Sequence, residues 1–193
     1  KKVNSANIKI IHPGIGEDPV PIRINYMEAM DEVFRSFVQN GFTKIKFVCG
    51  ADKSFLDDSR LICFRRLLDR YGLENKEESI VWGEYPRMNA MDTGHEAVKE
   101  IYKSERPDAI FFLTDMMAFG AMQELNDRGL RIGKDVSIIG FDNTQMGKFC
   151  VPSLSTIDSS IETEIQRYIS YILEKDCKND VIVSKFIKRD SSI

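Results

Sequence analysis

The chain has 193 residues, of which 42% are apolar, and a chain of this length and composition can bury a core, which excludes a disordered protein. Its 27 Lys and Arg residues stand against 30 Asp and Glu residues, and the formal net charge of −3 without a long basic run excludes a free-standing nucleic-acid binder. We therefore expect any contact with DNA to come from a segment outside this chain.

The predicted elements alternate short apolar runs with segments of helical period. The runs predicted as strands lie at residues 7–12, 20–24, 44–49, 79–82, 109–113, 136–140 and 181–187. The predicted helices lie at residues 27–38, 59–71 and 89–103, directly after the strand at 109–113, and at 160–175. This alternation is typical of βαβ units and predicts an α/β fold around a parallel sheet.

The ends of these helices have local causes. Asn40-Gly41, Gly72 and Gly129 each follow the last residue of an apolar stripe and are expected to end a helix. Asp57 and Asp58 stand before the helix at 59–71 and are candidate N-caps.

The cysteines and the apolar runs indicate a cytoplasmic protein. The four Cys residues form no CxxC pair and the chain has two His residues, so we expect neither a zinc site nor another cofactor. No apolar run approaches the roughly 18 residues of a membrane span, and the first residues lack the apolar core of a signal peptide. The chain does not begin with Met, and we expect its natural start to lie upstream.

Polar side chains stand near the ends of the predicted strands, at the edge where open parallel sheets bind their ligands. The residues that follow a predicted strand are Tyr85, Thr114, Asp115 and Asp142. Arg60 lies in the first turn of a helix and can reach the same edge. An Asp accepts from two vicinal hydroxyls, an Arg donates through a planar fork, and an aromatic ring covers the apolar face of a sugar or a base. Together these side chains suit a neutral, hydroxyl-rich ligand.

Each of these side chains also has an ordinary structural alternative. Asp115 and Asp142 could cap the helix or turn that follows them. Arg60 could pair only with a neighbouring carboxylate, and Tyr85 could pack in its own loop. His12 ends the first predicted strand and could face the same edge, or it could be an ordinary surface histidine. Their shared location at strand ends favours a binding site.

Familiar catalytic motifs are absent, and we expect a binding protein that is not an enzyme. The sequence has no GxSxG, HExxH or phosphate-binding loop. Asp52, Asp57 and Asp58 could hold a divalent ion in an enzyme, but Lys53 and Arg60 among them favour a surface loop. We therefore predict no metal site.

Several stretches of the chain, in order, resemble one family. The densest runs are FFLTDMMAFGAM at residues 111–122 and GLRIGKDVSIIGFD at residues 129–142. Shorter matching stretches lie at residues 41–45, 59–64, 152–157 and 186–192. Almost the whole chain thus resembles the effector-binding domain of the LacI/GalR family of bacterial transcription repressors.

This resemblance implies a two-lobed, periplasmic-binding-protein-like fold with a small effector, which we expect to be a sugar, in the cleft between the lobes. Residues 25–157 and 179–193 would form an essentially complete C-terminal lobe. Residues 1–24 and 158–178 would form a partial N-terminal lobe. The rest of that lobe and the helix-turn-helix headpiece that binds operator DNA would lie outside the chain.

The resemblance also implies the site and the assembly. The positions that match the family's effector contacts are Arg60, Tyr85, Thr114, Asp115, Asp142 and, in the N-terminal lobe, His12. Thr114 stands where the family usually has Asn, and Phe42 where it commonly has His, so the ligand type does not carry over. A homodimer is implied, in which the effector shifts the population of open and closed lobes and thereby changes operator binding. The alternative is a solute-binding protein of a sugar transporter, which shares the fold and the cleft.

Overall fold

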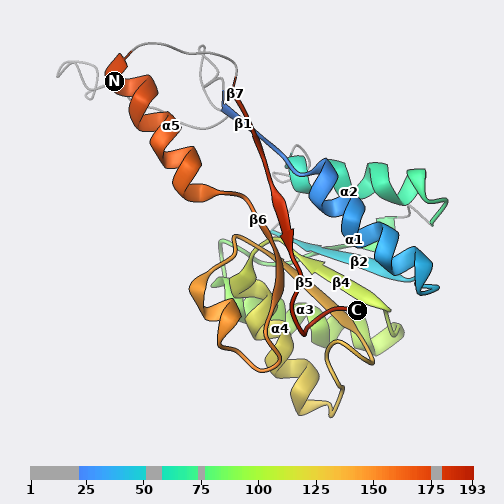
Figure 1. The fold of residues 1–193 in the computed structure, drawn as a ribbon. Helices are drawn as coiled ribbons and strands as arrows, with labels where there is room; N and C mark the ends of the chain where they lie inside the picture. The colour runs from blue at the N-terminus through green and yellow to red at the C-terminus, as the bar shows by residue number, and fades with distance from the viewer. Residues whose placement is uncertain (1–21, 51–57, 74–76, 175–179) are drawn as a thin grey trace.

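The computed structural model describes residues 22–50, 58–73, 77–174 and 180–193. Most of them build a six-stranded sheet covered by helices on both faces (Figure 1). In spatial order its strands are β3 (Ile80–Trp82), β2 (Ile45–Cys49), β4 (Ala109–Phe112), β5 (Ser137–Phe141), β6 (Ser155–Asp158) and β8 (Lys185–Ile187). Neighbouring strands are parallel from β3 to β6, and only β8 pairs antiparallel to its neighbour. The predicted α/β fold with a mostly parallel sheet is confirmed.

The helices lie where the apolar periodicity predicts them. They are α1 (Met27–Gln39), α2 (Ser59–Arg70), α3 (Ala90–Ser104), α4 (Asp115–Asp127) and α5 (Ile161–Glu174), with short 3₁₀ turns η3 (Glu77–Ser79) and η4 (Gln145–Lys148). Figure 1 shows α1 and α2 on one face of the large sheet and α3 and α4 on the other. Gly41, Gly72 and Gly129 follow helix ends with φ of 77°, 63° and 73°, a conformation that glycine adopts without strain.

The core lies between the central strands and the helices. Every residue of β2, β4 and β5 is buried, as expected for strands covered on both faces. Phe111 of β4 contacts the rings of Phe34, Phe47 and Phe64, with ring centroids 5.6, 6.4 and 5.7 Å away. These aromatic contacts join α1 and α2 to the sheet and fix the strands whose ends carry the predicted site.

Helices α3 and α4 cross at two glycines. A Cβ atom on Gly94 would lie 1.9 Å from the carbonyl oxygen of Met117, and one on Gly120 would lie 1.8 Å from that of Met91. No side chain fits in either place, so the two glycines set the distance between the helices.

A second, two-stranded sheet corrects one sequence prediction. β1 (Ile22–Asn25) pairs in parallel with β7 (Asp180–Val183), and β8 begins after Ser184 in the other sheet. The single strand predicted over residues 181–187 is therefore wrong. The physical reason is that the two halves have different partner strands, since β7 pairs with β1 and β8 pairs with β6. Ser184 lies between them, and its backbone N–H and Oγ both donate to the carbonyl oxygen of Asn25 at 3.1 and 3.0 Å.

The chain leaves the small sheet at Ser184 and enters the large one at β8. The predicted lobes, residues 25–157 with 179–193 and residues 1–24 with 158–178, stay a prediction. The predicted strand at 7–12 lies outside the described residues.

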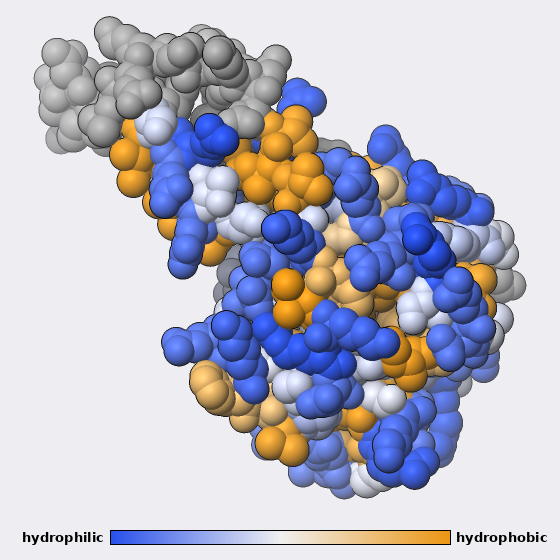
Figure 2. Space-filling view, in the orientation of Figure 1, coloured by the Kyte–Doolittle hydropathy of each residue, from blue (hydrophilic) through white to orange (hydrophobic). Residues whose placement is uncertain are grey.

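Helix α5 projects from the body of the molecule together with β1 and β7 (Figure 1). Its apolar stripe is on the surface, since Ile161, Ile165 and Ile169 are 52%, 51% and 48% exposed. Figure 2 shows apolar surface on this projecting part. Among the described helices, none is long and apolar enough to cross a membrane.

Candidate functional site

Arg60 is the centre of the candidate site. It lies in the first turn of α2, where Asp58 caps the helix by accepting from the Arg60 backbone N–H at 2.9 Å. The guanidinium turns toward β4 and donates from Nη1 to the carbonyl oxygen of Leu113 at 2.7 Å. Its Cζ lies 5.6 Å from the centre of the Phe141 ring at the end of β5. Arg60 thus joins the carboxyl ends of two neighbouring strands, as the sequence predicts.

Asp58 fixes the orientation of this guanidinium. Its two carboxylate oxygens accept from Arg60 Nε at 3.0 Å and from Nη2 at 2.6 Å. Burial lowers the pKa of Arg60, but the hydrogen bonds and the charge of Asp58 outweigh it, and the pKa lies above its usual value. The structural alternative considered for Arg60, an ion pair with a neighbouring carboxylate, is therefore present. The two side chains of this pair are only 18% and 14% exposed. Described residues accept from three of the five N–H donors of the Arg60 guanidinium, and no described residue accepts from the other two.

Asp142 lies at the same edge, directly after β5. Its backbone has a φ of 105°, and its N–H donates to the carbonyl oxygen of Ile157 at 3.0 Å. Among the residues that the structure describes, none donates a hydrogen bond to its carboxylate. Burial raises the pKa of Asp142 to about 7, with Arg60 lowering it and Asp115 and Asp58 raising it further. Within the described part of the chain, the Asp142 carboxylate is thus an acceptor without a hydrogen-bond donor, and its charge acts on the pKa of Arg60.

Tyr26 completes this corner, and the sequence analysis did not select it. It stands between β1 and α1, and its ring meets the Phe141 ring edge-on, with centroids 5.7 Å apart. Burial raises the pKa of Tyr26 to about 12, and the charges of Arg60 and Asp142 also act on it. An aromatic residue at the predicted lobe crossing near Ile24 is the signal that could have found it.

Thr114 and Asp115 hold the neighbouring loops. Thr114 is the N-cap of α4, and its Oγ1 accepts from the Met117 N–H at 3.2 Å. Asp115 is fully buried, and its carboxylate accepts from the Thr144 N–H and Oγ1 at 2.7 and 3.0 Å and from Thr156 Oγ1 at 2.6 Å. Burial raises the pKa of Asp115, although these hydrogen bonds lower it. Direct effector contacts from these two residues stay a prediction, and the structure gives both a structural role.

The remaining predicted residues are less closely tied to this corner. Tyr85 is half-buried after β3, packs against the core and precedes Pro86 across a cis peptide bond. His12, and the Asp52 and Asp57 of the considered metal loop, lie outside the described residues. Within the described ranges, no three His, Cys, Asp or Glu side chains stand close enough together to hold a metal ion.

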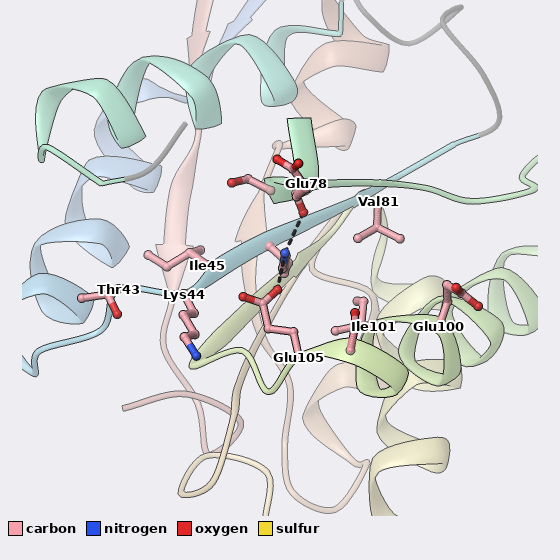
Figure 3. Close-up of a pocket in the computed structure, with 11 residues that line it drawn as sticks. Thr43, Lys44, Ile45, Glu78, Val81, Glu100, Ile101 and Glu105 are labelled. Carbon is pink, nitrogen blue, oxygen red and sulfur yellow. Dashed lines mark hydrogen bonds and ion pairs between the residues drawn. The ribbon is translucent and has the colours of Figure 1, made fainter. Parts of the chain in front are cut away.

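A cavity of about 580 Å³ lies at the opposite, amino-terminal edge of the sheet (Figure 3). It is lined in part by Lys46, Glu78 and Glu105. Lys46 is buried, donates to the Glu78 carbonyl oxygen at 2.7 Å and pairs with Glu105. Because Glu78 and Glu105 already bind the buried ammonium of Lys46, we do not place the candidate site in this cavity. We place it at the other edge of the sheet, at Arg60 and Asp142.

The comparisons with known proteins agree with this architecture. The sequence model of the periplasmic binding protein-like domain matches residues 34–182. The chain belongs to this family. The resemblance to LacI/GalR effector-binding domains is confirmed by relatives with that architecture.

Two curated relatives of this periplasmic-binding-protein-like chain are transcription regulators. Catabolite control protein A of Priestia megaterium is 33% identical over 138 residues, which are 70% of this chain and 40% of the relative. The probable repressor ExuR of Bacillus subtilis is 29% identical over 174 residues, which are 86% of this chain and 51% of the relative. The chain therefore spans about half the length of the curated relatives that it matches.

Solved structures agree. The Escherichia coli repressor ascG superposes with a TM-score of 0.72 at 26% identity, over 88% of this chain and 63% of that one. A LacI-type regulator from Bifidobacterium animalis gives a TM-score of 0.74 at 27% identity, over 89% and 66%. The relatives and structures named here are transcription regulators, and the transporter alternative is not favoured.

Proposed function

We propose that the chain is the effector-sensing part of a LacI-type transcription repressor and that it binds a neutral, hydroxyl-rich effector, a sugar, in an interlobe cleft. The single observation that carries this proposal is that the Arg60 guanidinium and the Asp142 carboxylate lie at the same carboxyl edge of the sheet, where the charge of each acts on the pKa of the other. A vicinal diol can donate to the carboxylate and accept from the guanidinium at once. No net charge on the ligand is needed.

The surrounding residues would give this ligand its orientation. Phe141 and Tyr26 supply aromatic surface beside the guanidinium. Tyr85, at the end of the edge strand, would cover the ligand from the side. Thr114 would contribute its hydroxyl, and Asp115 would act by holding the loop after β5. His12 would contribute from the N-terminal lobe.

The regulatory role follows from the relatives. Effector binding would shift the population of open and closed lobe arrangements and so change the spacing of two DNA-binding headpieces on an operator. The named relatives are regulators, and we propose that this protein too is a cytoplasmic repressor without enzymatic activity.

An apolar surface around η4 would serve a homodimer. Met146, Phe149 and Val151 are 52%, 75% and 85% exposed and lie close together in the chain. A hollow of about 350 Å³ beside them is lined in part by Phe119 and Met122 of α4. Exposed apolar side chains gathered in this way are typical of protein interfaces. The dimeric Lac repressor shares this fold.

Calorimetric titration of the full-length protein tests the site. The probes are neutral mono- and disaccharides, with hypoxanthine as a base without hydroxyl-bearing carbons. We expect one sugar to bind, and Arg60→Met and Asp142→Asn each to weaken it by roughly tenfold or more, since each removes a hydrogen bond to a charged group. Arg131→Met is the matched control, because Arg131 forms an exposed pair with Asp135. Equal affinity in all variants would contradict the site, and binding of hypoxanthine alone would contradict the sugar.

A further inference from the structure

The loop that carries Asp142 has a backbone that needs external support. Asp142 and the next residue, Asn143, have φ of 105° and 51°, in the region that ordinary side chains rarely adopt. Two consecutive residues of this kind persist only where the surroundings hold them. Part of that support is local to the sheet edge, since the Asn143 N–H donates to Thr156 Oγ1 at 3.3 Å.

The other support comes from Arg189, near the C-terminal end of the chain. Its Nη2 donates to the Asn143 side-chain carbonyl Oδ1 at 2.6 Å, and its Nη1 donates to the carbonyl oxygen of Leu154 at 2.5 Å. A guanidinium holds two acceptors in one plane, which an ammonium cannot do. Arg189 thus fixes the position of the Asn143 side chain relative to β6.

Asn143 passes this constraint on. Its Nδ2 donates to Asp158 Oδ2 at 3.2 Å, at the end of β6. The other oxygen of Asp158 accepts from the Ser160 N–H at 2.8 Å, and Ser160 itself has a φ of 55°. A row of hydrogen bonds therefore runs from Arg189 through Asn143 and Asp158 to the turn that leads into α5.

This row reaches one connection that leaves the large sheet. Asp158 to Ser160 lead from β6 to α5, and Arg189 lies just after β8, the strand that pairs with β6. The loop of Asp142 lies between them.

We propose that Arg189 is a positioning residue for Asp142 and that the Arg189–Asn143–Asp158 row couples the orientation of Asp142 to the β6–α5 connection. A change in the direction of α5 is then felt at Asp142, and fixing Asp142 restrains α5. The inference rests on the proposed function only in the role given to Asp142 as an effector contact, because the coupling itself exists without a ligand.

Hydrogen–deuterium exchange of the ligand-free, full-length protein, followed by mass spectrometry, tests the coupling. We expect Arg189→Met to speed exchange at residues 142–145 and also at residues 158–161, by roughly tenfold or more, since it removes hydrogen bonds from a charged group. Exchange in β4 stays unchanged. Arg189→Lys restores part of the protection, and the surface control Arg131→Met has no effect at either place.

Asp158→Asn tests the row from its other end. The oxygen of the introduced amide still accepts from the Ser160 N–H, but its NH₂ group now faces the Asn143 amide donor, so the substitution breaks a single contact of the row. We expect faster exchange that extends beyond Asn143 to Asp142 and Thr144, and this variant decides the question even if Arg189→Met fails to fold. Faster exchange only near the substituted residue in both variants, or a uniform rise across β4, would overturn the proposal.

Affinity for the sugar found by calorimetry separates this inference from the proposed function. Faster exchange at both residues 142–145 and residues 158–161, together with weaker sugar binding in Arg189→Met, supports the coupling and the proposed function. Coupled exchange with unchanged sugar binding supports the positioning by Arg189 and overturns the role of Asp142 as an effector contact.

Discussion

Replacing Asp142 by Asn should stabilise the protein at neutral and basic pH. Burial raises the pKa of this carboxyl from 3.8 to about 7. The folded protein therefore holds the proton more tightly than the unfolded chain does, and stability falls as the pH rises from about 4 to about 7. Asn has nearly the same shape, tolerates the positive φ and carries no charge to desolvate. The substitution removes the cost of ionising a buried group.

The size of this effect follows from the pKa. At about 1.4 kcal/mol for each pKa unit, the displacement of Asp142 corresponds to about 4 kcal/mol at pH 8 as an upper value. For a chain of this length, such a change raises the melting temperature by about 8–16 °C. At pH 4, close to the pKa of 3.8 of the unfolded carboxyl, most of this cost is gone, and the difference between Asp142→Asn and the parent should fall to about 0.5 kcal/mol.

Thermal unfolding followed by circular dichroism between pH 2 and pH 8 measures this. Asp135→Asn is the control of opposite sign, because hydrogen bonds from Arg131 lower the pKa of Asp135 to about 2. It should destabilise the protein at pH 8 and lose this effect as the pH falls toward 2. A melting temperature of Asp142→Asn that equals that of the parent at pH 8, or exceeds it equally at every pH, would refute the reasoning.

Three further predictions concern packing, capping and assembly. Gly120→Ala should lower the free energy of unfolding by about 1–3 kcal/mol in urea denaturation, because its Cβ would lie 1.8 Å from the Met91 carbonyl oxygen; an unchanged midpoint would contradict the close helix crossing. Thr114→Val should cost about 1 kcal/mol by removing the acceptor of the Met117 N–H, whereas Thr114→Ser should cost little. Phe149→Ser should shift the full-length protein toward the monomer in sedimentation without lowering monomer stability, since Phe149 is 75% exposed. A dimer of unchanged affinity would exclude this surface.

Much of the fold could be predicted because its signals are local. The buried run of β4, the polar Thr114 after it and Gly129 at the far end are enough to place β4 and α4, and the structure confirms both. The meeting of Arg60 with the ends of β4 and β5 also follows from a rule about parallel sheets.

The rest depends on contacts between distant parts of the chain. Asp115 has the same sequence pattern as an exposed ligand-binding Asp, and its burial results from Thr144 and Thr156, which lie 29 and 41 residues away. The strand predicted over residues 181–187 divides at Ser184 because its two halves pair with β1 and with β6, and Asn25 at the end of β1 lies 159 residues from Ser184. Such partners leave no periodic pattern, so local reasoning could predict neither the burial of Asp115 nor the break at Ser184.

The hydrogen bonds of Ser184 to Asn25 also have a mechanical consequence. They clamp β1 and β7 together at the point where both strands approach the large sheet, so the two strands act as one ribbon. The projecting part, which consists of β1, β7 and α5, is then attached to the large sheet at two places. One is this ribbon of β1 and β7, and the other is the link from β6 to α5. Two points of attachment define an axis. We expect the projecting part to rotate about this axis more easily than it slides or twists in any other direction.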